Sequence, residues 1–542
     1  MTEPTDEQLV VIDGPAMART LVEADPGTGK TFALIARSIH LAEELGEAVL
    51  VLSFTRAVVA EIRRRAAEIG GARLETSTID GYAARVLLSA GLDLKDSFDA
   101  TIRAATALVR EHPELVPRPG HVLVDEVQDL GGPRLEFVLT ILGHAERGFT
   151  ALGDPKQAIY SWQGEEEDAF AALTASFPDV ERRGLTLVHR PRVAALLKAD
   201  AIDGEALLLD AKAMGSVSQA AFLVRRGRAV ILTRTNGEAL ALADQLAALG
   251  ARALVRQGAQ ARMAPSWVAR FVNASPRDTW SRRQVTSGIE SVAGAPPADE
   301  GWRVLRRVGR KDDGVSAESV RLAVLDPTRY DDFAFADEGA ISTVHRAKGL
   351  EWDDVVVLEP LPEETRSEEE QRVLFVAATR ARREVWRLRR PEFDGRLERG
   401  AGGRWERRTW QRRLLACEVQ IGDVTLDRPF AADGSSAAEI QERLAAIDAG
   451  TAVALAFDEG RGRYVVACDG HLVAETTDAF TASIRQRWRG MPRALSGGRI
   501  LTVRSAAGDP AAGDAEGLVG TGLWLAPEIV GFVGPENEEG EL

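Results

Sequence analysis

A glycine-rich turn that ends in lysine and threonine is the first part of the sequence whose residue types could do chemistry. Its residues are Ala24, Asp25, Pro26, Gly27, Thr28, Gly29, Lys30 and Thr31. An apolar run precedes the turn and a helical pattern follows it, which is the context that a phosphate-binding loop requires. The glycines let backbone N–H groups turn toward phosphate oxygens, the lysine reaches the β- and γ-phosphates, and the threonine hydroxyl ligates Mg²⁺. The spacing therefore predicts ATP and Mg²⁺ as ligands; the alternative is a glycine-rich turn that only starts a helix.

Two adjacent carboxylates, Asp125 and Glu126, end a second apolar run about 95 residues further along the chain. Adjacent carboxylates at the end of a buried strand are costly without a cation. We expect Asp125 to hold Mg²⁺ through water, and Glu126 to orient and deprotonate an attacking water. The alternative is the solvated start of a loop.

Short apolar runs, each followed by a turn or a helical stretch, must position these groups. The first series lies at residues 20–25, 48–54, 121–126 and 148–154. A second series lies at residues 229–234, 340–345 and 354–360. Such alternation predicts an α/β fold with parallel sheets.

Two other regions differ from this pattern. Residues 260–335 are rich in Arg, Gly, Pro and Ser, with weak periodicity, and look like a small insertion. Residues 416–533 carry β-like pieces joined by turns, and predict a small β-rich C-terminal domain. Residues 534–542 are acidic and predict a disordered tail.

The composition is that of a globular protein. A length of 542 residues suggests three or four domains, with 45% hydrophobic and 27% charged residues. The net charge of −15 argues against a general affinity for nucleic acid but permits a local basic groove. No apolar run is long enough to span a membrane. The polar N-terminus and only two cysteines, Cys417 and Cys468, favour a cytoplasmic location.

Several segments, taken in order, match one known family. They are TDEQ (5–8), SFTRAVVAEIRRR (53–65), DEVQD (125–129), GDPKQAIYSWQG (153–164), LVHRP (187–191), TVHRAKGLEWDDVVV (343–357) and VAATRAR (376–382). Together with the phosphate loop, this set resembles the UvrD/Rep/PcrA branch of the superfamily 1 DNA helicases. The resemblance covers residues 5–390. The C-terminal region is more distantly similar to bacterial relatives of the F-box DNA helicase.

The resemblance implies a fold of two RecA-like P-loop motor domains that hydrolyse ATP. The implied nucleotide contacts outside the phosphate loop are Gln8, Arg37, His189 and Glu351. The implied catalytic residues are Glu126, Gln157 as a γ-phosphate sensor, and Arg190 and Arg380 as arginine fingers. A finger stabilises the charge on the transferring phosphoryl group. Arg190 by itself is also consistent with a surface arginine.

The resemblance also implies a path for single-stranded DNA. Its contacts would be Phe54, Thr55, Arg56, Thr78, Tyr160, Trp162 and His345. Tyr160 and Trp162 would present aromatic faces on which bases stack. The alternatives are that both rings belong to the core, and that His345 is a hydrogen-bonded structural group.

The chain departs from the family pattern at four positions. His189 stands where the family has a Tyr that packs on adenine, and Phe32 replaces an Arg after the phosphate loop. Gln163 replaces the Arg of the WRG segment, and Asp80 replaces a His. None of these is an ATP-site residue named above except His189, so we expect the chemistry to survive while the grip on nucleotide and DNA changes.

The same family implies a domain order. We expect motor domain 1A at 1–183 with a minimal 1B insertion at 86–118, motor domain 2A at 184–260 and 336–415, a reduced 2B-like insertion at 261–335, the β-rich domain at 416–533 and the tail at 534–542. Because both insertions are reduced, a translocase that needs help to unwind duplex is one possible outcome.

Residues 382–413 combine twelve arginines with Trp386, Phe393, Trp405 and Trp410. Basic residues interleaved with aromatic ones fit a nucleic-acid groove or a strand-separating hairpin. The alternative is a solvated connection between the motor and the terminal domain.

We therefore expect an ATP-dependent helicase or translocase that moves 3′ to 5′ and acts in DNA repair, recombination or replication. Its partners would be single-stranded DNA and junctions with duplex, with a protein partner for the β-rich domain. A helicase–nuclease fusion is one rival, but a RecB-type nuclease needs a catalytic lysine and the last lysine of this chain is Lys348. The other rival is a non-enzymatic, ATP-switched DNA-binding scaffold.

Overall fold

The computed structural model describes most of the chain, in two compact units. The described residues are 3–45, 48–53, 59, 62, 74–95, 97–159, 168–189, 208, 211–227, 229–251, 255, 263–326, 333, 340–361, 367–432, 434–515, 518 and 520–535. Unit 1 comprises residues 1–212 and 347–387, and unit 2 comprises residues 213–346 and 388–542. Among the helices in these ranges, none is both long enough and apolar enough to cross a membrane.

Unit 1 is built on a six-stranded parallel sheet, of strand order β3-β2-β4-β5-β1-β6. The strands are β1 (Arg19–Ala24), β2 (Val49–Ser53), β3 (Leu74–Thr78), β4 (His121–Val124), β5 (Gly148–Gly153) and β6 (Glu181–Leu185). Every residue of β2, β4 and β5 is buried, because helices cover both faces of a parallel sheet. The predicted α/β fold is confirmed here. The carboxyl ends of all six strands lie along one edge, where ligands bind in such sheets.

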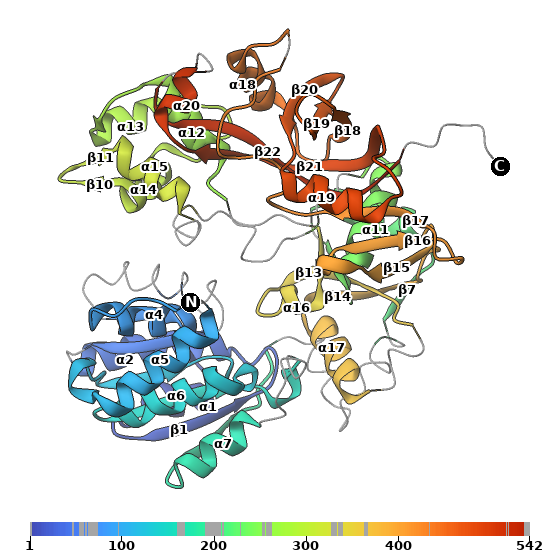
Figure 1. Cartoon of the computed structure of the whole chain (residues 1–542). Coiled ribbons are helices and arrows are strands. Elements are labelled where there is room, and N and C mark those ends of the chain that lie inside the picture. The colour runs from blue at the N-terminus through green and yellow to red at the C-terminus, as the bar shows by residue number, and fades with distance from the viewer. Residues whose placement is uncertain are drawn as a thin grey trace. The chain divides into compact units, whose positions relative to one another are not determined.

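The helices that accompany this sheet run from blue to blue-green in Figure 1. They are α1 (Asp6–Ile12), α2 (Lys30–Leu45), α4 (Ile79–Ser89), α5 (Phe98–Glu111), α6 (Gly132–His144) and α7 (Ala169–Ser176). Among the described residues between β3 and β4, the chain forms α4, α5 and the 3-10 helix η1 (Pro113–Leu115). Ile102 and Val109 of α5 are buried in one hydrophobic cluster with Phe137 of α6. The region expected to hold a minimal insertion is therefore part of the core of this unit.

A second sheet has five strands in the order β12-β8-β13-β14-β7. They are β7 (Lys212–Met214), β8 (Ala229–Thr233), β12 (Ile341–Thr343), β13 (Trp352–Leu358) and β14 (Ala381–Leu388). The pair β8 and β12 is parallel, with Ile231 beside Ile341. Its associated helices are α10 (Val217–Arg225), α11 (Asn236–Ala248), α16 (Val344–Ala347) and α17 (Glu368–Thr379). The second α/β series of the sequence thus forms a sheet of its own.

The predicted insertion folds as four helices and a small antiparallel sheet. The helices are α12 (Ser266–Ala274), α13 (Arg282–Ile289), α14 (Ala298–Gly309) and α15 (Ala317–Leu325). The sheet has the order β10-β11-β9, with β9 (Thr279–Trp280), β10 (Arg310–Lys311) and β11 (Gly314–Ser316).

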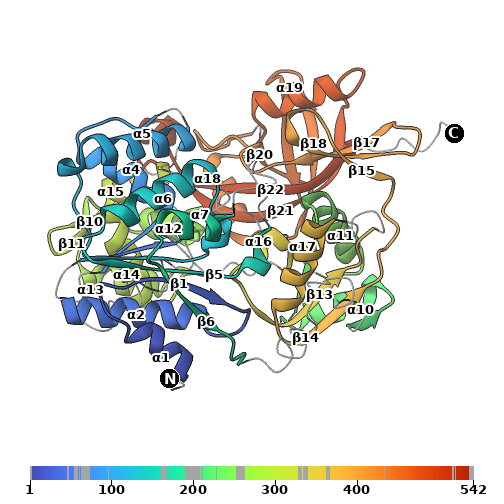
Figure 2. The same ribbon diagram turned by 90° about the horizontal axis from the view of Figure 1, so that it is seen from below.

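The C-terminal region is an eight-stranded antiparallel sheet of order β15-β16-β17-β22-β21-β18-β19-β20. Its strands are β15 (Arg396–Arg399), β16 (Trp405–Arg408), β17 (Leu414–Val419), β18 (Ala452–Asp458), β19 (Arg463–Cys468), β20 (His471–Glu475), β21 (Ala494–Ala507) and β22 (Leu523–Pro535). The helices α18 (Ala437–Ala446), α19 (Asp478–Arg487) and α20 (Pro510–Ala515) accompany it. The long central pair β21 and β22 is drawn in red in Figure 2. The β-rich region is confirmed, but its sheet begins at Arg396 rather than near 416.

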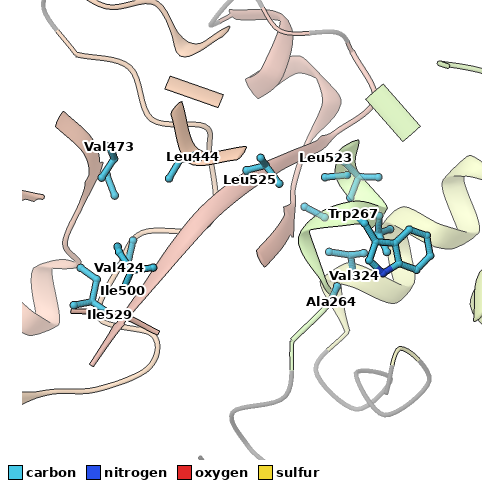
Figure 3. Packing of buried hydrophobic residues seen from close by; sticks show 14 of the residues in the cluster. Ala264, Trp267, Val324, Val424, Leu444, Val473, Ile500, Leu523, Leu525 and Ile529 are labelled. Atoms are coloured by element: carbon cyan, nitrogen blue, oxygen red, sulfur yellow. The ribbon is translucent and has the colours of Figure 1, made fainter. Parts of the chain in front are cut away.

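The insertion and the C-terminal sheet share one hydrophobic core. Trp267 of α12 is buried in the same cluster as Leu523 and Leu525 of β22 (Figure 3). The hydroxyl of Ser505 accepts a hydrogen bond from the backbone of Ala269 at 2.8 Å and donates to the carbonyl of Pro265 at 2.7 Å. The insertion and the C-terminal sheet thus share buried residues, while their division into separate domains stays a prediction.

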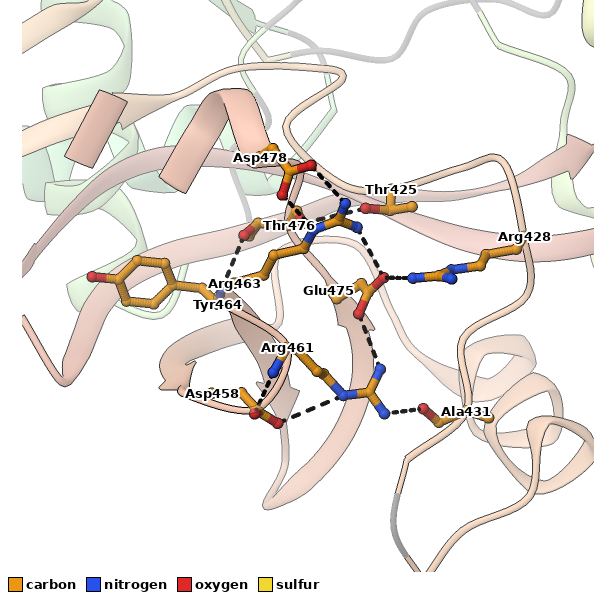
Figure 4. A network of polar contacts seen from close by, with 10 residues as sticks. All are labelled: Thr425, Arg428, Ala431, Asp458, Arg461, Arg463, Tyr464, Glu475, Thr476 and Asp478. Atoms are coloured by element: carbon orange, nitrogen blue, oxygen red, sulfur yellow. Dashed lines mark hydrogen bonds and ion pairs between the residues drawn. The ribbon is translucent and has the colours of Figure 1, made fainter. Parts of the chain in front are cut away.

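A buried carboxylate, Glu475, holds a loop against strands β19 and β20 (Figure 4). It accepts hydrogen bonds from Arg428 at 2.8 Å, Arg461 at 3.0 Å and Arg463 at 3.2 Å. Arg463 is also paired with Asp478 at 2.6 Å. Burial alone would raise the pKa of Glu475, but Arg428 and Arg461 hold it below its ordinary value.

We predict that Glu475→Gln destabilises unit 2 by about 1–3 kcal/mol at neutral pH, because the arginines lose a charged acceptor. A carboxyl whose pKa is lowered on folding stabilises the protein above its unfolded-state pKa, and this contribution is lost as the pH falls through the folded-state value. In urea unfolding experiments the deficit of the variant should therefore stay constant from neutral pH down to about 4.5, and shrink as the pH falls further. Glu442→Gln, at an exposed position on α18, is the control. A deficit that does not change with pH would contradict the charge-based explanation.

Candidate nucleotide site

The turn between β1 and α2 has the backbone geometry of a phosphate-binding loop. Gly27 and Gly29 have φ angles of 77° and 79°, which favour glycine. A Cβ on Gly29 would lie 2.5 Å from Nε2 of Gln8. The loop is anchored by backbone hydrogen bonds from Asp25 to Leu185 at 3.1 Å and from His189 to Gly27 at 2.9 Å. Its N–H groups are thus held at the carboxyl end of the sheet, beside the start of α2.

Helix α1 lies against the same loop through Gln8. The side chain of Gln8 forms a capping box with Thr5 and donates to the carbonyl of Thr28 at 2.8 Å. Its Nε2 atom lies 3.3 Å from Nε2 of His189. Gln8 and His189, the two residues expected to contact the adenine, are therefore neighbours.

Arg37 is buried on α2 and donates to the carbonyls of Ile12 at 2.9 Å and Pro15 at 3.0 Å. It also donates to the carbonyl of Gly14. These contacts fix the chain that follows α1, so Arg37 positions the helix that carries Gln8. A direct contact of Arg37 with the nucleotide stays a prediction.

Lys30, Asp125 and Glu126 form a buried charge cluster. Nζ of Lys30 lies 2.9 Å from Oε1 of Glu126 and 4.0 Å from Oδ1 of Asp125. Burial favours the neutral amine, but the two carboxylates outweigh it and raise the pKa of Lys30. Burial also opposes the ionised form of Glu126, yet Lys30 and Lys348 lower its pKa. Lys30 and Glu126 are therefore a charged pair at neutral pH.

Asp125 is placed differently from its neighbour. It is fully buried, and within the described part of the chain neither of its carboxylate oxygens accepts a hydrogen bond. Burial and the nearby Glu126 raise the pKa of Asp125. Oxygen ligands of this kind suit Mg²⁺, whose charge would compensate the buried carboxylate. Asp125 and Thr31, at the start of α2, thus fit the predicted magnesium site.

The backbone of Glu126 has φ 55° and ψ 44°, the left-handed region that non-glycine residues rarely occupy. Such strained positions are concentrated at functional sites. The conformation turns the chain sharply at the end of β4, and it places the Asp125 and Glu126 carboxylates in different surroundings.

A continuous chain of hydrogen bonds connects Glu126 to Arg380. The amide of Gln128 donates to Glu126 and accepts from the backbone of Asp154 at 2.9 Å. Asp154 accepts from Nε2 of Gln157 at 2.7 Å. Arg380 in turn donates to Oε1 of Gln157 at 2.9 Å. Three of the four expected catalytic residues are therefore brought together, and the fourth, Arg190, lies outside the described residues.

Arg380 and Lys348 reach this site from the second segment of unit 1, residues 347–387. Arg380 follows α17, and its Nε also donates to the carbonyl of Val376 at 3.1 Å. Lys348 donates to the carboxylate of Asp129 and to the backbone carbonyl of Gln157. Gln157 is thus held by two cations that follow it in the chain by about 190 and 220 residues.

Sequence reasoning did not single out Gln128, Lys156 or Lys348. Lys156 pairs with Asp25 of the phosphate loop at 2.9 Å. The sequence did contain a signal for Lys348, because this residue lies inside the segment TVHRAKGLEWDDVVV (343–357) that resembles the helicase family. Its partner Asp129 completes the DEVQD segment, but nothing in the sequence links the two positions.

The expected DNA contacts are only partly described. Phe54, Thr55, Arg56, Tyr160 and Trp162 lie outside the described residues. Thr78 caps α4, with its hydroxyl accepting from the backbone of Gly81 at 3.1 Å. His345 lies on α16 and is half-buried.

Two further positions have surface ion pairs. Glu351, expected near the nucleotide sugar, lies 3.4 Å from Arg382. Asp80, one of the departures from the family pattern, pairs with Arg134 at 2.9 Å, and Arg134 also reaches Asp99 at 3.3 Å. The unusual carboxylate is thus neutralised within unit 1.

The parallel sheet, the phosphate loop and the carboxylates at the end of β4 define a P-loop nucleotide-binding motor domain. Residues 8–163 match the family model described as an AAA domain. Residues 338–387 match the model of the UvrD-like helicase C-terminal domain. Two segments of the chain are therefore similar to an AAA domain and to the C-terminal domain of UvrD-like helicases.

Similarity to individual proteins is restricted to short segments. The ATP-dependent DNA helicase Rep of Salmonella typhimurium is 34% identical over 88 residues, which cover 16% of this chain and 13% of that protein. Rep of Escherichia coli is 35% identical over 85 residues, covering 15% and 12%. The aligned part therefore spans about an eighth of the length of these relatives. The alignment with a solved arterivirus nonstructural protein 10 (helicase) covers 70% of this chain and 61% of that chain, at 12% identity and with a TM-score of 0.27.

We predict that Lys348→Met lowers the free energy of unfolding by about 3–5 kcal/mol, because Asp129 is left as an unpaired buried charge. The double variant Lys348→Met/Asp129→Asn should recover most of this loss, since the uncompensated carboxylate is removed. Urea unfolding of both single variants and the double variant measures the coupling. Additive losses would mean that the two side chains do not stabilise each other.

Proposed function

We propose that the chain is an ATP-driven helicase or translocase acting on DNA. The observation that carries the proposal is the hydrogen-bonded chain from Glu126 through Gln157 to Arg380, beside a phosphate loop with Lys30. A general base, a γ-phosphate sensor and an arginine finger are the parts that phosphoryl transfer to water requires. The similarity to the Rep helicases supports DNA as the partner.

In this proposal the residues have separate roles. The loop amides and Lys30 bind the phosphates of ATP, while Asp125 and Thr31 hold Mg²⁺, which would supply charge compensation to the β- and γ-phosphates. Glu126 accepts a proton from the attacking water. Lys30 and Glu126 pair with each other here, and phosphate binding by Lys30 would release Glu126 for this task.

Arg380 stabilises the charge on the transferring phosphoryl group, together with Arg190. Gln157 is positioned to report the state of the γ-phosphate, because its amide is shared between Asp154 and Arg380. Gln8 and His189 contact the adenine, and Glu351 contacts the sugar. The family pattern gives the direction of movement as 3′ to 5′.

The proposed DNA path uses Thr78 and His345 together with Phe54, Thr55, Arg56, Tyr160 and Trp162. Its substrates are single-stranded DNA and junctions with duplex, in repair, recombination or replication. The insertion at 261–335 packs against the C-terminal sheet, so this composite body is the candidate surface for a protein partner. A non-enzymatic ATP switch is disfavoured by the intact base and finger positions.

The experiment that tests the proposal is a steady-state ATPase assay with and without single-stranded DNA. A DNA-dependent motor is expected to hydrolyse ATP faster when DNA is bound. Nucleotide binding without turnover in either condition would favour the switch instead.

We predict that Glu126→Gln keeps ATP binding and lowers turnover by at least about 10²-fold, because the water loses its base while Asp125 remains. Binding of a fluorescent ATP analogue and phosphate release should be measured on the same preparation. Glu136→Gln, at an exposed position on α6, is the matched control and should leave both unchanged. Turnover of Glu126→Gln within a few-fold of wild type would remove Glu126 from this role.

We predict that Arg380→Ala lowers the catalytic rate by about 10³-fold or more and weakens ATP affinity far less. An interaction made mainly with the reacting phosphoryl group contributes to the barrier rather than to ground-state binding. Arg383→Ala, a half-exposed arginine three residues later, is the control. The Arg380→Ala variant should bind DNA but fail to translocate. Hydrolysis of ATP by this variant at the wild-type rate would refute the proposed arginine finger.

A further inference from the structure

The turn that joins β16 to β17 presents a tryptophan to solvent. Trp410 is 80% exposed, the highest value among the large hydrophobic side chains of the described residues. Isolated exposed hydrophobic residues are ordinary, but a side chain as large as tryptophan is usually well buried. A functional reason for its exposure is therefore worth seeking in its surroundings.

The backbone of this turn, residues 409–413, is held by several hydrogen bonds. The N–H of Thr409 donates to the carbonyl of Arg413 at 2.8 Å, and the N–H of Arg412 donates to the carbonyl of Thr409 at 2.8 Å. The Thr409 hydroxyl accepts from the N–H of Arg413 at 3.1 Å. Arg408 donates to the carbonyl of Arg412 at 2.9 Å. The turn thus displays Trp410 on an ordered support.

The turn 409–413 is anchored in strand β16 of the C-terminal sheet. Arg408 pairs with Glu406, which is buried and also accepts from Arg487 at 2.9 Å. On the same strand Arg407 pairs with Asp244 at 2.9 Å. These arginines of the basic segment therefore have carboxylate partners and serve the fold.

The guanidinium of Arg396 lies 5.9 Å from the centroid of the Trp410 ring, its Nε lies 3.5 Å from Oε1 of Glu398, and Arg396 faces Arg408 across the strand pair. Two arginines at the end of the turn have different surroundings. Arg412 and Arg413 are exposed, and within the described part of the chain neither pairs with a carboxylate. An aromatic face with unneutralised cations beside it suits a ligand that has both flat rings and phosphates.

We propose that the turn 409–413 is a binding site for single-stranded DNA, in which one base stacks on Trp410 and the adjacent phosphates contact Arg412 and Arg413. Stacking of this kind tolerates any base, because every base has a π-face. The inference rests on the proposed action on DNA and adds a contact outside the two motor sheets. If the turn bound a protein partner instead of DNA, the partner would contact the exposed Trp410 ring, and binding would not depend on nucleotide bases.

The test compares two ligands for the full chain by fluorescence anisotropy at fixed salt: a dT oligonucleotide and one of the same length without bases. Trp410→Ala should weaken binding of the dT oligonucleotide by roughly tenfold and leave binding of the base-free one unchanged. Trp410→Phe should restore most of the affinity because the ring is kept. Leu415→Ala, an exposed apolar neighbour, should change neither ligand.

The arginines have a separate signature. The double variant Arg412→Ala/Arg413→Ala should weaken both ligands and reduce the slope of log affinity against log salt by about one to two. Equal affinity of wild type and Trp410→Ala for the dT oligonucleotide would overturn the inference. So would an equal loss on both ligands. If either result is found while DNA still stimulates the ATPase activity, only the binding site at residues 409–413 is refuted. If the wild-type protein neither binds DNA nor hydrolyses ATP faster in its presence, the proposed function is overturned as well.

Discussion

The buried ion pair between Lys30 and Glu126 is the interaction on which the arrangement of unit 1 depends. Two carboxylates and an amine at the end of a buried strand would be unfavourable one by one, and their mutual compensation makes the group tolerable. Neither carboxylate oxygen of Asp125 accepts a hydrogen bond within the described residues, although Nζ of Lys30 lies 4.0 Å away. Asp125 is therefore the carboxylate that we propose as a ligand of Mg²⁺.

The groups that surround this pair come from distant parts of the chain. Gln128 and Asp154 follow strands β4 and β5 of the first sheet, whereas Lys348 and Arg380 come after the insertion of unit 2 in the chain. They meet at Gln157, which has a cation on its backbone carbonyl and another on its side chain. Gln157 therefore contacts both the candidate nucleotide site and the second segment of unit 1, which contains α17.

The predicted fold class is confirmed, whereas the chemical roles assigned to the site residues stay a prediction. The phosphate loop and the carboxylates at the end of β4 follow from local spacing, since glycine, lysine and adjacent acids leave few alternatives. The strands β15 and β16 could not be recognised, because charged residues occupy most of their positions and hide the alternation of a strand. The role of Arg37 was also hidden, because its partners are backbone carbonyls that no residue type reveals. The pairing of Lys348 with Asp129 depends on folding of remote segments.

Because the insertion and the C-terminal sheet share one hydrophobic core, substitutions in these two regions are expected to be coupled during evolution. Trp267 and Leu523 are separated by more than 250 positions in the gene product, yet each is buried against the same cluster. A substitution that alters the volume of one region selects for a compensating substitution in the other. The insertion and the C-terminal sheet are therefore expected to be gained, lost and diversified together during evolution.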